Sequence, residues 1–360
     1  MNIHRHSSLS ALTVGTLALS GLAVPTAGAE EVTPVTVNIL ATSDFHGRIS
    51  VVHGRDGSLV DPGAAALACF IDAERDRNPD TNFVAAGDLI SGSPFVSSIL
   101  RDKPTLDAFN AMGLDVSALG NHEFDNGFGD VSARVSFDGT GQAKFPYIAA
   151  NISGADPAPA PSYIVTTASG VRIAYVGGVT AEAPSIVNPD GVVGLQFSEP
   201  VAAMNAEAER IAAADEADVI IGLVHERVHV NSGFSDAFDA VVAGHTHKET
   251  LETGPERAGR QPLVVSSPAN TGACSPTSTS SSIPRPARSP PSPHRTTPPP
   301  TSGRSAAKPP TPRCSRSSPP PRRRPPRRGS VSSPPYRSPS CADGIPPTVT
   351  PAATGAWSPH

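Results

Sequence analysis

Five short clusters of metal-binding residue types lie between positions 44 and 247 of this 360-residue chain. In chain order they are Asp44-Phe45-His46, Gly87-Asp88, Gly120-Asn121-His122-Glu123, His225 and Gly244-His245-Thr246-His247. Imidazole and carboxylate groups together suit divalent zinc, manganese or iron. Two such cations about 3.5 to 4 Å apart favour hydrolysis of a phosphoester, because they hold both the attacking and the leaving oxygen. The clusters therefore indicate a two-metal hydrolytic site.

Asp88 is the natural carboxylate to contact both cations of such a pair. Glycines precede Asp88, Asn121 and His245, and a glycine lets the backbone turn sharply and approach an ion closely. Taken singly, Asp88 also fits a helix cap, Asn121 a turn residue and His225 a core hydrogen bond. The interpretation depends on the ordered set of five clusters and not on any one member.

The elements that must position these residues follow an α/β pattern, in which apolar strands buried on both faces alternate with amphipathic helices. The expected strands cover residues 35–42, 83–86, 116–119, 147–150, 163–167, 171–176, 219–224, 240–243 and 263–266. The expected helices cover residues 64–77, 95–112 and 201–214, the last with Ser198 as its N-cap. A hairpin is expected to turn at Ser169-Gly170.

Each of the five clusters follows one of the expected strands. Ligands of open α/β sheets bind at the carboxyl ends of the strands, so the five segments are expected to converge on one crevice. His53 and His229 end no expected strand, and we interpret them as surface histidines.

The first 29 residues have the features of a secretory signal. Arg5 supplies a short basic start, residues 9–24 are largely apolar, and Ala27-Gly28-Ala29 offers a small-residue cleavage site. A transmembrane anchor is the alternative, but serine, threonine and glycine interrupt the run, which falls short of the ~20 apolar residues of a spanning helix. We expect a secreted protein (extracellular, periplasmic or cell-wall associated) after signal-peptide cleavage near Ala29.

The composition of the chain changes after residue 270. Residues 1–270 contain 15 Lys and Arg against 32 Asp and Glu, whereas residues 271–360 contain 13 against one. The last 90 residues also hold 24 of the 40 prolines, and such a Pro/Arg/Ser-rich segment cannot bury enough apolar surface to fold. We expect a catalytic domain over residues 33–270 and a disordered, low-complexity basic tail over residues 271–360.

Two origins of this tail remain open. A genuine basic arm would be weakly attracted to anionic wall polymers. A change of reading frame in a GC-rich gene would yield the same composition, rich in Pro, Arg, Ser and Thr. The composition of the tail favours this frameshift origin.

The four cysteines carry no expected role. Cys69 falls in an apolar helical stretch, where a buried and inert cysteine is the commoner case. Cys274, Cys314 and Cys341 are scattered through Pro-rich sequence without the spacing of metal ligands.

The ordered clusters resemble those of the calcineurin-like metallophosphoesterases. The longer strings Ala41-Thr42-Ser43-Asp44-Phe45-His46-Gly47-Arg48 and Gly120-Asn121-His122-Glu123-Phe124-Asp125 are more narrowly similar to the secreted bacterial 5'-nucleotidase family. The resemblance covers residues 35–270 and implies an α/β four-layer metallophosphoesterase sandwich, with two central β-sheets flanked by helices. It does not extend to the C-terminal domain that holds the nucleoside in that family.

The resemblance also implies roles for individual residues. One cation would be held by Asp44, His46, Asp88 and His247, and the other by Asp88, Asn121, His225 and His245. His122 corresponds to the catalytic histidine of the family, and Asp125 to the carboxylate that orients it. Arg48 is interpreted, from its charge and position, as a neighbour of a phosphate oxygen. The implied cofactors are two divalent ions, zinc, manganese or similar.

Residues and resemblance together predict a monomeric, metal-dependent hydrolase of nucleotide or other small phosphoesters, like 5'-nucleotidases and 2',3'-cyclic phosphodiesterases. Specific nucleic-acid binding is not expected. Two alternatives come from other classes: a metal-binding but inactive truncated remnant, and a secreted protein that binds wall polymers or other polyanions through its tail. Metal content and turnover of an aryl phosphate test the first alternative, and salt-sensitive loss of binding after tail deletion tests the second.

Overall fold

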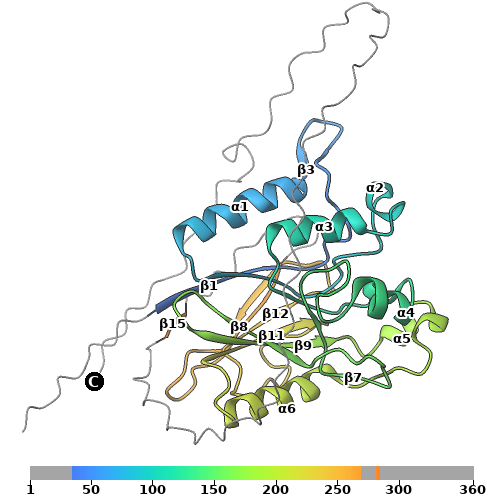
Figure 1. The fold of residues 1–360 in the computed structure, drawn as a ribbon. Coiled ribbons are helices and arrows are strands. Elements are labelled where there is room, and N and C mark those ends of the chain that lie inside the picture. Colours follow the sequence, from blue (N-terminus) through green and yellow to red (C-terminus); the bar gives the residue numbers. More distant parts are fainter. Residues whose placement is uncertain (1–34, 269–280, 284–360) are drawn as a thin grey trace, which may run out of the picture.

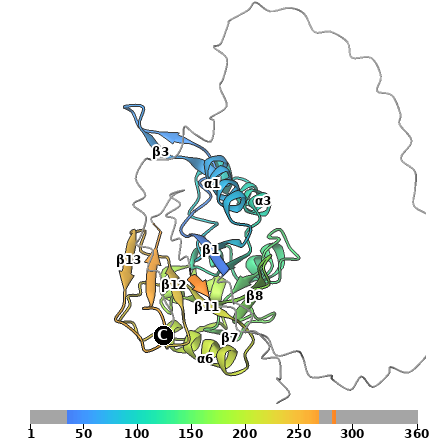
Figure 2. The same ribbon diagram turned by 90° about the vertical axis from the view of Figure 1, so that its left-hand side faces the viewer.

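Two β-sheets stack against each other in the middle of the protein, and helices cover their outer faces (Figure 1). The computed structural model describes residues 35–268 and 281–283. In Figure 2, turned by 90°, helices α1 and α3 lie above the sheets and α6 lies below them. The expected four-layer α/β sandwich is therefore confirmed. The signal segment and most of the basic tail lie outside the described residues.

The first sheet has the strand order β15-β1-β4-β5-β6, and the second has the order β13-β14-β12-β11-β9-β8. The first contains β1 (Val35–Thr42), β4 (Thr81–Ala85), β5 (Val116–Ala118), β6 (Tyr147–Ile148) and β15 (Ser281–Ile283). The second contains β8 (Ser162–Thr166), β9 (Arg172–Val179), β11 (Val219–His225), β12 (Ala240–Ala243), β13 (Thr250–Thr253) and β14 (Val264–Ser267). Two small pairs join β2 (Val52–His53) to β3 (Leu59–Asp61) and β7 (Ile152–Ser153) to β10 (Gln196–Phe197).

The helices are α1 (Gly63–Arg77), α2 (Phe95–Ser98), α3 (Lys103–Met112), α4 (Phe128–Asp130), α5 (Ala183–Ile186) and α6 (Pro200–Ala213). Shorter helical turns cover His122–Phe124, Val131–Val135 and Pro189–Val192. Within the described part of the chain, no helix combines the length and the apolar character needed to cross a membrane.

Strand side chains alternate between the layers and so build three apolar cores. On β1, Ile39 packs between the two sheets and Leu40 packs under α1 and α3. On β9, Tyr175 joins the core between the sheets, whereas Val176 packs against Met204 of α6. Because both faces of each sheet are covered, the central strands are apolar throughout, as their sequences predicted.

All nine expected strands are present, with ends that differ by up to three residues. The expected hairpin is also confirmed, since β8 pairs antiparallel with β9 across Ser169-Gly170. The sequence did not predict β15, which lies within the tail and pairs antiparallel with the start of β1.

The single helix expected over residues 95–112 is wrong, because α2 and α3 are separate. Arg101 and Asp102 between them have positive φ angles of 53° and 57°, which interrupt a right-handed helix. The Asp102 carboxylate is buried and accepts the Ser91 backbone N–H at 3.1 Å. A long-range contact therefore ends the helix where local propensity would continue it.

Two smaller expectations also need correction. Glu199, not Ser198, caps α6, and its carboxylate accepts the backbone N–H groups of Val201 at 3.0 Å and Ala202 at 2.7 Å. Cys69 is half-buried and disulfide-bonded, and so is not an inert buried thiol. The other three cysteines lie outside the described residues.

Candidate metal centre

The five clusters predicted from the sequence meet at one edge of the molecule. The parallel strands β1, β4 and β5 end there in the first sheet, and β11 and β12 end there in the second. Candidate ligand atoms fall into three groups, each spanning no more than 4.8 Å: Asp44 with His46 and His247, His46 with Asp88 and His122, and Asp88 with His225 and His245. Because His46 and Asp88 each belong to two groups, the three form one continuous cluster.

Asp88 occupies the middle of this cluster. Its Oδ2 atom lies 2.9 Å from His225 Nε2 and 3.8 Å from His46 Nε2, and its side chain is almost fully buried. Burial is the largest single influence and raises the pKa of Asp88, but the charge and hydrogen bond of His225 together with the charges of His122 and His46 lower it to about 2. Asp88 therefore stays ionised and offers a buried negative charge to a cation.

Hydrogen bonds fix which nitrogen of the two buried imidazoles faces the cluster. His225 Nδ1 lies 2.7 Å from the Ala86 carbonyl, and His46 Nδ1 lies 3.0 Å from the Ser91 carbonyl. Since a carbonyl only accepts, each Nδ1 carries a hydrogen, and the neutral ring leaves a lone pair on Nε2. The Nε2 atom of His225 faces the Asp88 carboxylate, and that of His46 lies 3.3 Å from His247 Nε2.

These nitrogen and oxygen atoms converge closely enough to hold a divalent metal, which would displace the proton that His225 Nε2 shares with Asp88 Oδ2 in the metal-free protein. The Oδ1 of Asn121 is buried and finds no hydrogen-bond donor among the described residues. Burial lowers the pKa of His46 and of His245, which favours the neutral imidazole that binds metals. Burial also lowers the pKa of His225, but the charge and hydrogen bond of Asp88, with the charge of Asp44 and the hydrogen bond to the Ala86 carbonyl, together raise it to about 9, so this position favours a positive charge.

The backbone around the cluster is strained. Five of the seven candidate ligands have φ angles in the left-handed region, namely Asp44 at 51°, His46 at 46°, Asp88 at 54°, His245 at 74° and His247 at 56°. Each such residue costs on the order of 1–3 kcal/mol and persists only where the surrounding structure holds it. Strain of this kind clusters at functional sites. The concentration of positive φ angles at these candidate ligands supports a binding site here.

His122 and Asp125 form a pair beside the cluster. His122 Nδ1 lies 2.8 Å from Asp125 Oδ2, and both side chains are about one third exposed. The hydrogen bond that His122 Nδ1 donates to the Asp125 carboxylate is the main cause that raises the pKa of His122 to about 9. The His122 ring also packs edge-on against His46, with centroids 4.9 Å apart. His122 is therefore a partly accessible imidazole that its carboxylate partner keeps basic.

Arg48 and the two excluded histidines lie in different surroundings. The Nε atom of Arg48 is buried and finds no hydrogen-bond acceptor among the described residues. His53 is exposed on β2. His229 is also exposed, and its Nδ1 lies 2.7 Å from Glu252 Oε1 on β13. Neither histidine belongs to a candidate ligand group.

Sequence reasoning missed the role of Glu123. This residue was visible within the third cluster, but its carboxylate does not face the cluster of ligands. It is 1% exposed and accepts hydrogen bonds from backbone N–H groups of Asp88, Leu89 and Gly120 at 2.9, 2.9 and 2.7 Å. The available signal was the position of this acidic residue, directly after His122 in the third cluster.

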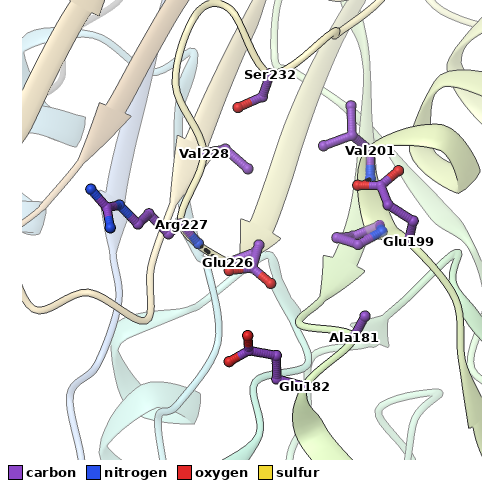
Figure 3. Close-up of a pocket in the computed structure, with 9 residues that line it drawn as sticks. Ala181, Glu182, Glu199, Val201, Glu226, Arg227, Val228 and Ser232 are labelled. Atoms are coloured by element: carbon purple, nitrogen blue, oxygen red, sulfur yellow. Dashed lines mark hydrogen bonds between the residues drawn. The ribbon is translucent and has the colours of Figure 1, made fainter.

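A pocket of about 390 Å³ opens beside this edge, beyond the ends of β9 and β11 and at the start of α6. Figure 3 shows the carboxylates of Glu182 and Glu226 within it and the guanidinium of Arg227 extending away from them. Glu199 also lines the pocket. Its acidic lining would repel a phosphate group, so the histidine cluster is the better candidate for phosphate binding.

The two-sheet sandwich with metal-type ligands at its strand ends defines a metallohydrolase architecture. The sequence profile described as calcineurin-like phosphoesterase matches residues 37–249. The chain therefore belongs to the calcineurin-like phosphoesterase family.

Similar proteins extend this assignment. The endonuclease YhcR of Bacillus subtilis (strain 168) is 31% identical over 196 residues, which cover 49% of this chain and 16% of that protein. The 5'-nucleotidase of Rattus norvegicus is 29% identical over 271 residues, covering 70% of this chain and 45% of that protein. These alignments thus span less than half of either relative.

A solved structure of similar fold is that of the calcineurin-like phosphoesterase YfkN from Bacillus subtilis. It superposes with a TM-score of 0.53 and 26% identity, covering 66% of this chain and 83% of that chain. The two-sheet fold is thus shared with a structure of the same family.

Proposed function

We propose that this chain is a secreted phosphoesterase that hydrolyses nucleotide phosphoesters with the help of two divalent cations, zinc, manganese or similar. The main support is the continuous cluster in which Asp88 belongs to two ligand groups. A tetrahedral metal takes about four ligands, and the seven candidate side chains exceed what one such ion would use. Two neighbouring positions with Asp88 shared account for all seven.

The proposed partition adds Asp88 to the group of Asp44, His46 and His247, adds Asn121 to the group of Asp88, His225 and His245, and leaves His122 of the third group free for substrate. The first position uses Asp44, His46, Asp88 and His247, and the second uses Asp88, Asn121, His225 and His245. Asn121 lies outside the three groups of His, Asp and Glu, but its buried and unpaired Oδ1 atom supports its inclusion. Carboxamide and carboxylate oxygens with neutral imidazoles are a suitable donor set for zinc or manganese.

When bound, the cations would supply positive charge for the phosphoryl oxygens and make water a better nucleophile at neutral pH. His122 is placed to donate a hydrogen bond or a proton to the phosphate from its partly exposed ring. The Asp125 carboxylate, bonded to Nδ1, fixes the orientation of that ring and leaves Nε2 for the substrate. Arg48 is proposed as a neighbour of a phosphate oxygen, because its Nε atom has no acceptor among the described residues.

A nucleotide substrate is proposed from the relatives named 5'-nucleotidase, which are 27% to 29% identical over about 270 residues. The aligned segment covers 45% of those proteins, so their remaining part has no counterpart in the alignment. Phosphoester hydrolysis follows from the residues of this chain, whereas the preference for a nucleoside follows from its relatives. Binding energy from base and sugar would raise the rate with nucleotides over simple phosphoesters.

Secretion is proposed from the amino-terminal signal pattern. A similar protein named cell wall protein Lmo0130, from Listeria monocytogenes, is 29% identical over 191 residues and supports an extracellular setting. We propose a monomer that acts outside the cytoplasm.

The test is hydrolysis by the purified full chain, loaded with Mn²⁺, of AMP, 2',3'-cyclic AMP and p-nitrophenyl phosphate. We expect phosphate release that disappears with a chelator and returns with added Mn²⁺. A protein that binds two Mn²⁺ ions but hydrolyses none of the three would support the inactive-remnant alternative. Hydrolysis of the aryl phosphate without either nucleotide would limit the proposal to a general phosphoesterase.

A further inference from the structure

The loops after β4 and β5 hold each other through two buried carboxylates. From the β5 side, Glu123 Oε2 accepts the N–H groups of Asp88 and Gly120, and Oε1 accepts the N–H of Leu89. From the β4 side, Asp88 Oδ1 accepts the N–H of His122 at 2.8 Å. The links are reciprocal, so neither loop can move without breaking hydrogen bonds to the other.

This reciprocal arrangement decides which oxygen of Asp88 is available. Oδ1 is taken by the His122 N–H, and Oδ2 points to His225 and His46. The Asp88 backbone has a φ of 54°, a conformation that needs external support. Glu123 gives that support, because it binds the N–H of Asp88 and of the next residue.

The two loops are in close contact at Gly120. A Cβ atom on Gly120 would lie 2.6 Å from the Asp88 nitrogen and would also collide with Asp88 Oδ1. Glu123 therefore reaches the two loops at a point where their backbones are in direct contact. A carboxylate suits this point, because it offers only acceptors to a set of converging N–H donors.

We propose that Glu123 is a positioning residue that fixes Asp88, the carboxylate shared by both cations, in its binding geometry before any metal arrives. The inference rests on the proposed two-metal function and names the group that prepares it. Glu123 acts through the peptide N–H groups of the β4 loop and does not contact the cations. Outer-shell partners of this kind typically change metal affinity or activity about 10- to 100-fold.

The test compares Glu123→Gln with a matched control, Asp115→Asn. Asp115 Oδ2 accepts the Phe83 N–H at 2.8 Å, so it makes the same type of bond to the same region of β4, but away from the cluster. Gln at position 123 keeps the side-chain volume and turns one acceptor into a donor that faces N–H groups. Mn²⁺ binding is measured by calorimetry, the coupled spectrum of the Mn²⁺ pair by electron paramagnetic resonance, and kcat and KM with p-nitrophenyl phosphate.

We expect Glu123→Gln to bind Mn²⁺ about 10- to 100-fold more weakly than the wild type. At Mn²⁺ concentrations that saturate the wild type, the variant should lack the coupled spectrum. Its kcat should fall by a larger factor than its KM changes. Asp115→Asn should keep wild-type Mn²⁺ affinity and spectrum even where its melting temperature falls. A folded Glu123→Gln protein with wild-type affinity and spectrum would overturn the inference while the proposed function stands. A wild-type protein that binds no Mn²⁺ would overturn both.

A second measurement on the wild-type protein covers the case in which Glu123→Gln does not fold. Hydrogen exchange of the amides of Asp88, Leu89 and Gly120 is followed with and without Mn²⁺. We expect these three amides to be protected in the metal-free protein, because Glu123 already binds them. Protection that develops only after Mn²⁺ is added would show that the metal orders the loop, and would overturn the inference.

Discussion

Candidate ligands lie in two regions that are held in place very differently. One region is the pair of loops after β4 and β5, and the other is the turn after β12. The Asp88 side chain is 2% exposed, and two carboxylates cross-link its loop to the neighbouring one. The His247 side chain is 41% exposed, and its turn is held by hydrogen bonds from the His245 N–H to Asp44 at 3.1 and 3.2 Å. One side of the site is therefore fixed, and the other is open to solvent.

This difference indicates that the two regions contribute to the candidate site in different ways. The fixed side sets the positions of Asp88 and His122, and the roles proposed for these two residues need accurate positioning. The open turn contributes His247, whose nitrogen lies 3.3 Å from both Asp44 Oδ1 and His46 Nε2. Substitutions in the fixed loops should thus cost more than substitutions in the turn, and four variants test this order.

Asp88→Asn is expected to have the largest effect. The variant removes the charge shared by the two proposed cations, so both should be lost together with turnover. The loss of activity should exceed the ~10- to 100-fold that an outer-shell change costs. Metal analysis and phosphate release after Mn²⁺ loading measure it. Retention of two tightly bound Mn²⁺ ions would contradict a bridging role for Asp88.

His122→Ala is expected to keep both cations and to lose about 10²- to 10⁴-fold in kcat, the range for loss of a general acid or base. The reason is that His122 is bonded to Asp125 and partly exposed, as expected of a group that faces substrate. Steady-state kinetics with p-nitrophenyl phosphate and metal analysis are the measurements. An unchanged kcat would remove the assignment of His122.

His247→Ala is expected to cost less than either change in the fixed loops. The half-exposed imidazole can be replaced by water, so Mn²⁺ at the first position should bind near the lower end of the ~10- to 100-fold weakening. Activity should return as the Mn²⁺ concentration is raised. Titration of activity with Mn²⁺ measures this. A loss of activity that excess Mn²⁺ cannot restore would mean that the turn is as important for activity as the fixed loops.

His229→Ala is expected to have the smallest effect. His229 pairs with Glu252 at the surface and belongs to no ligand group, so kcat, KM and Mn²⁺ affinity should match the wild type. The same assays measure it beside the other three variants. A large loss of activity would mean that the site extends beyond the seven candidate ligands.

Much of the fold was predictable because its strands are buried on both faces. Continuous apolar runs marked all nine expected strands, and the candidate metal ligands lie at or just after the ends of five of them. The break between α2 and α3 and the Glu199 cap were not predictable, because each depends on a side chain that finds a better partner in three dimensions. The Asp102 carboxylate accepts the Ser91 N–H, and the Ser198 hydroxyl donates to the Asn151 carbonyl at 3.3 Å and so does not cap α6.

The sequence by itself determined the chemical types of the ligands, their order and their placement after strands, since these depend on residue identity and local hydrophobic pattern. Only the tertiary structure decided which atoms meet. The ring nitrogen that His46 and His225 present depends on the carbonyls of Ser91 and Ala86 in the loop after β4, and the free oxygen of Asp88 depends on the His122 N–H. Glu123 acquired its role in the same way, because its N–H partners are brought together by the pairing of β4 with β5.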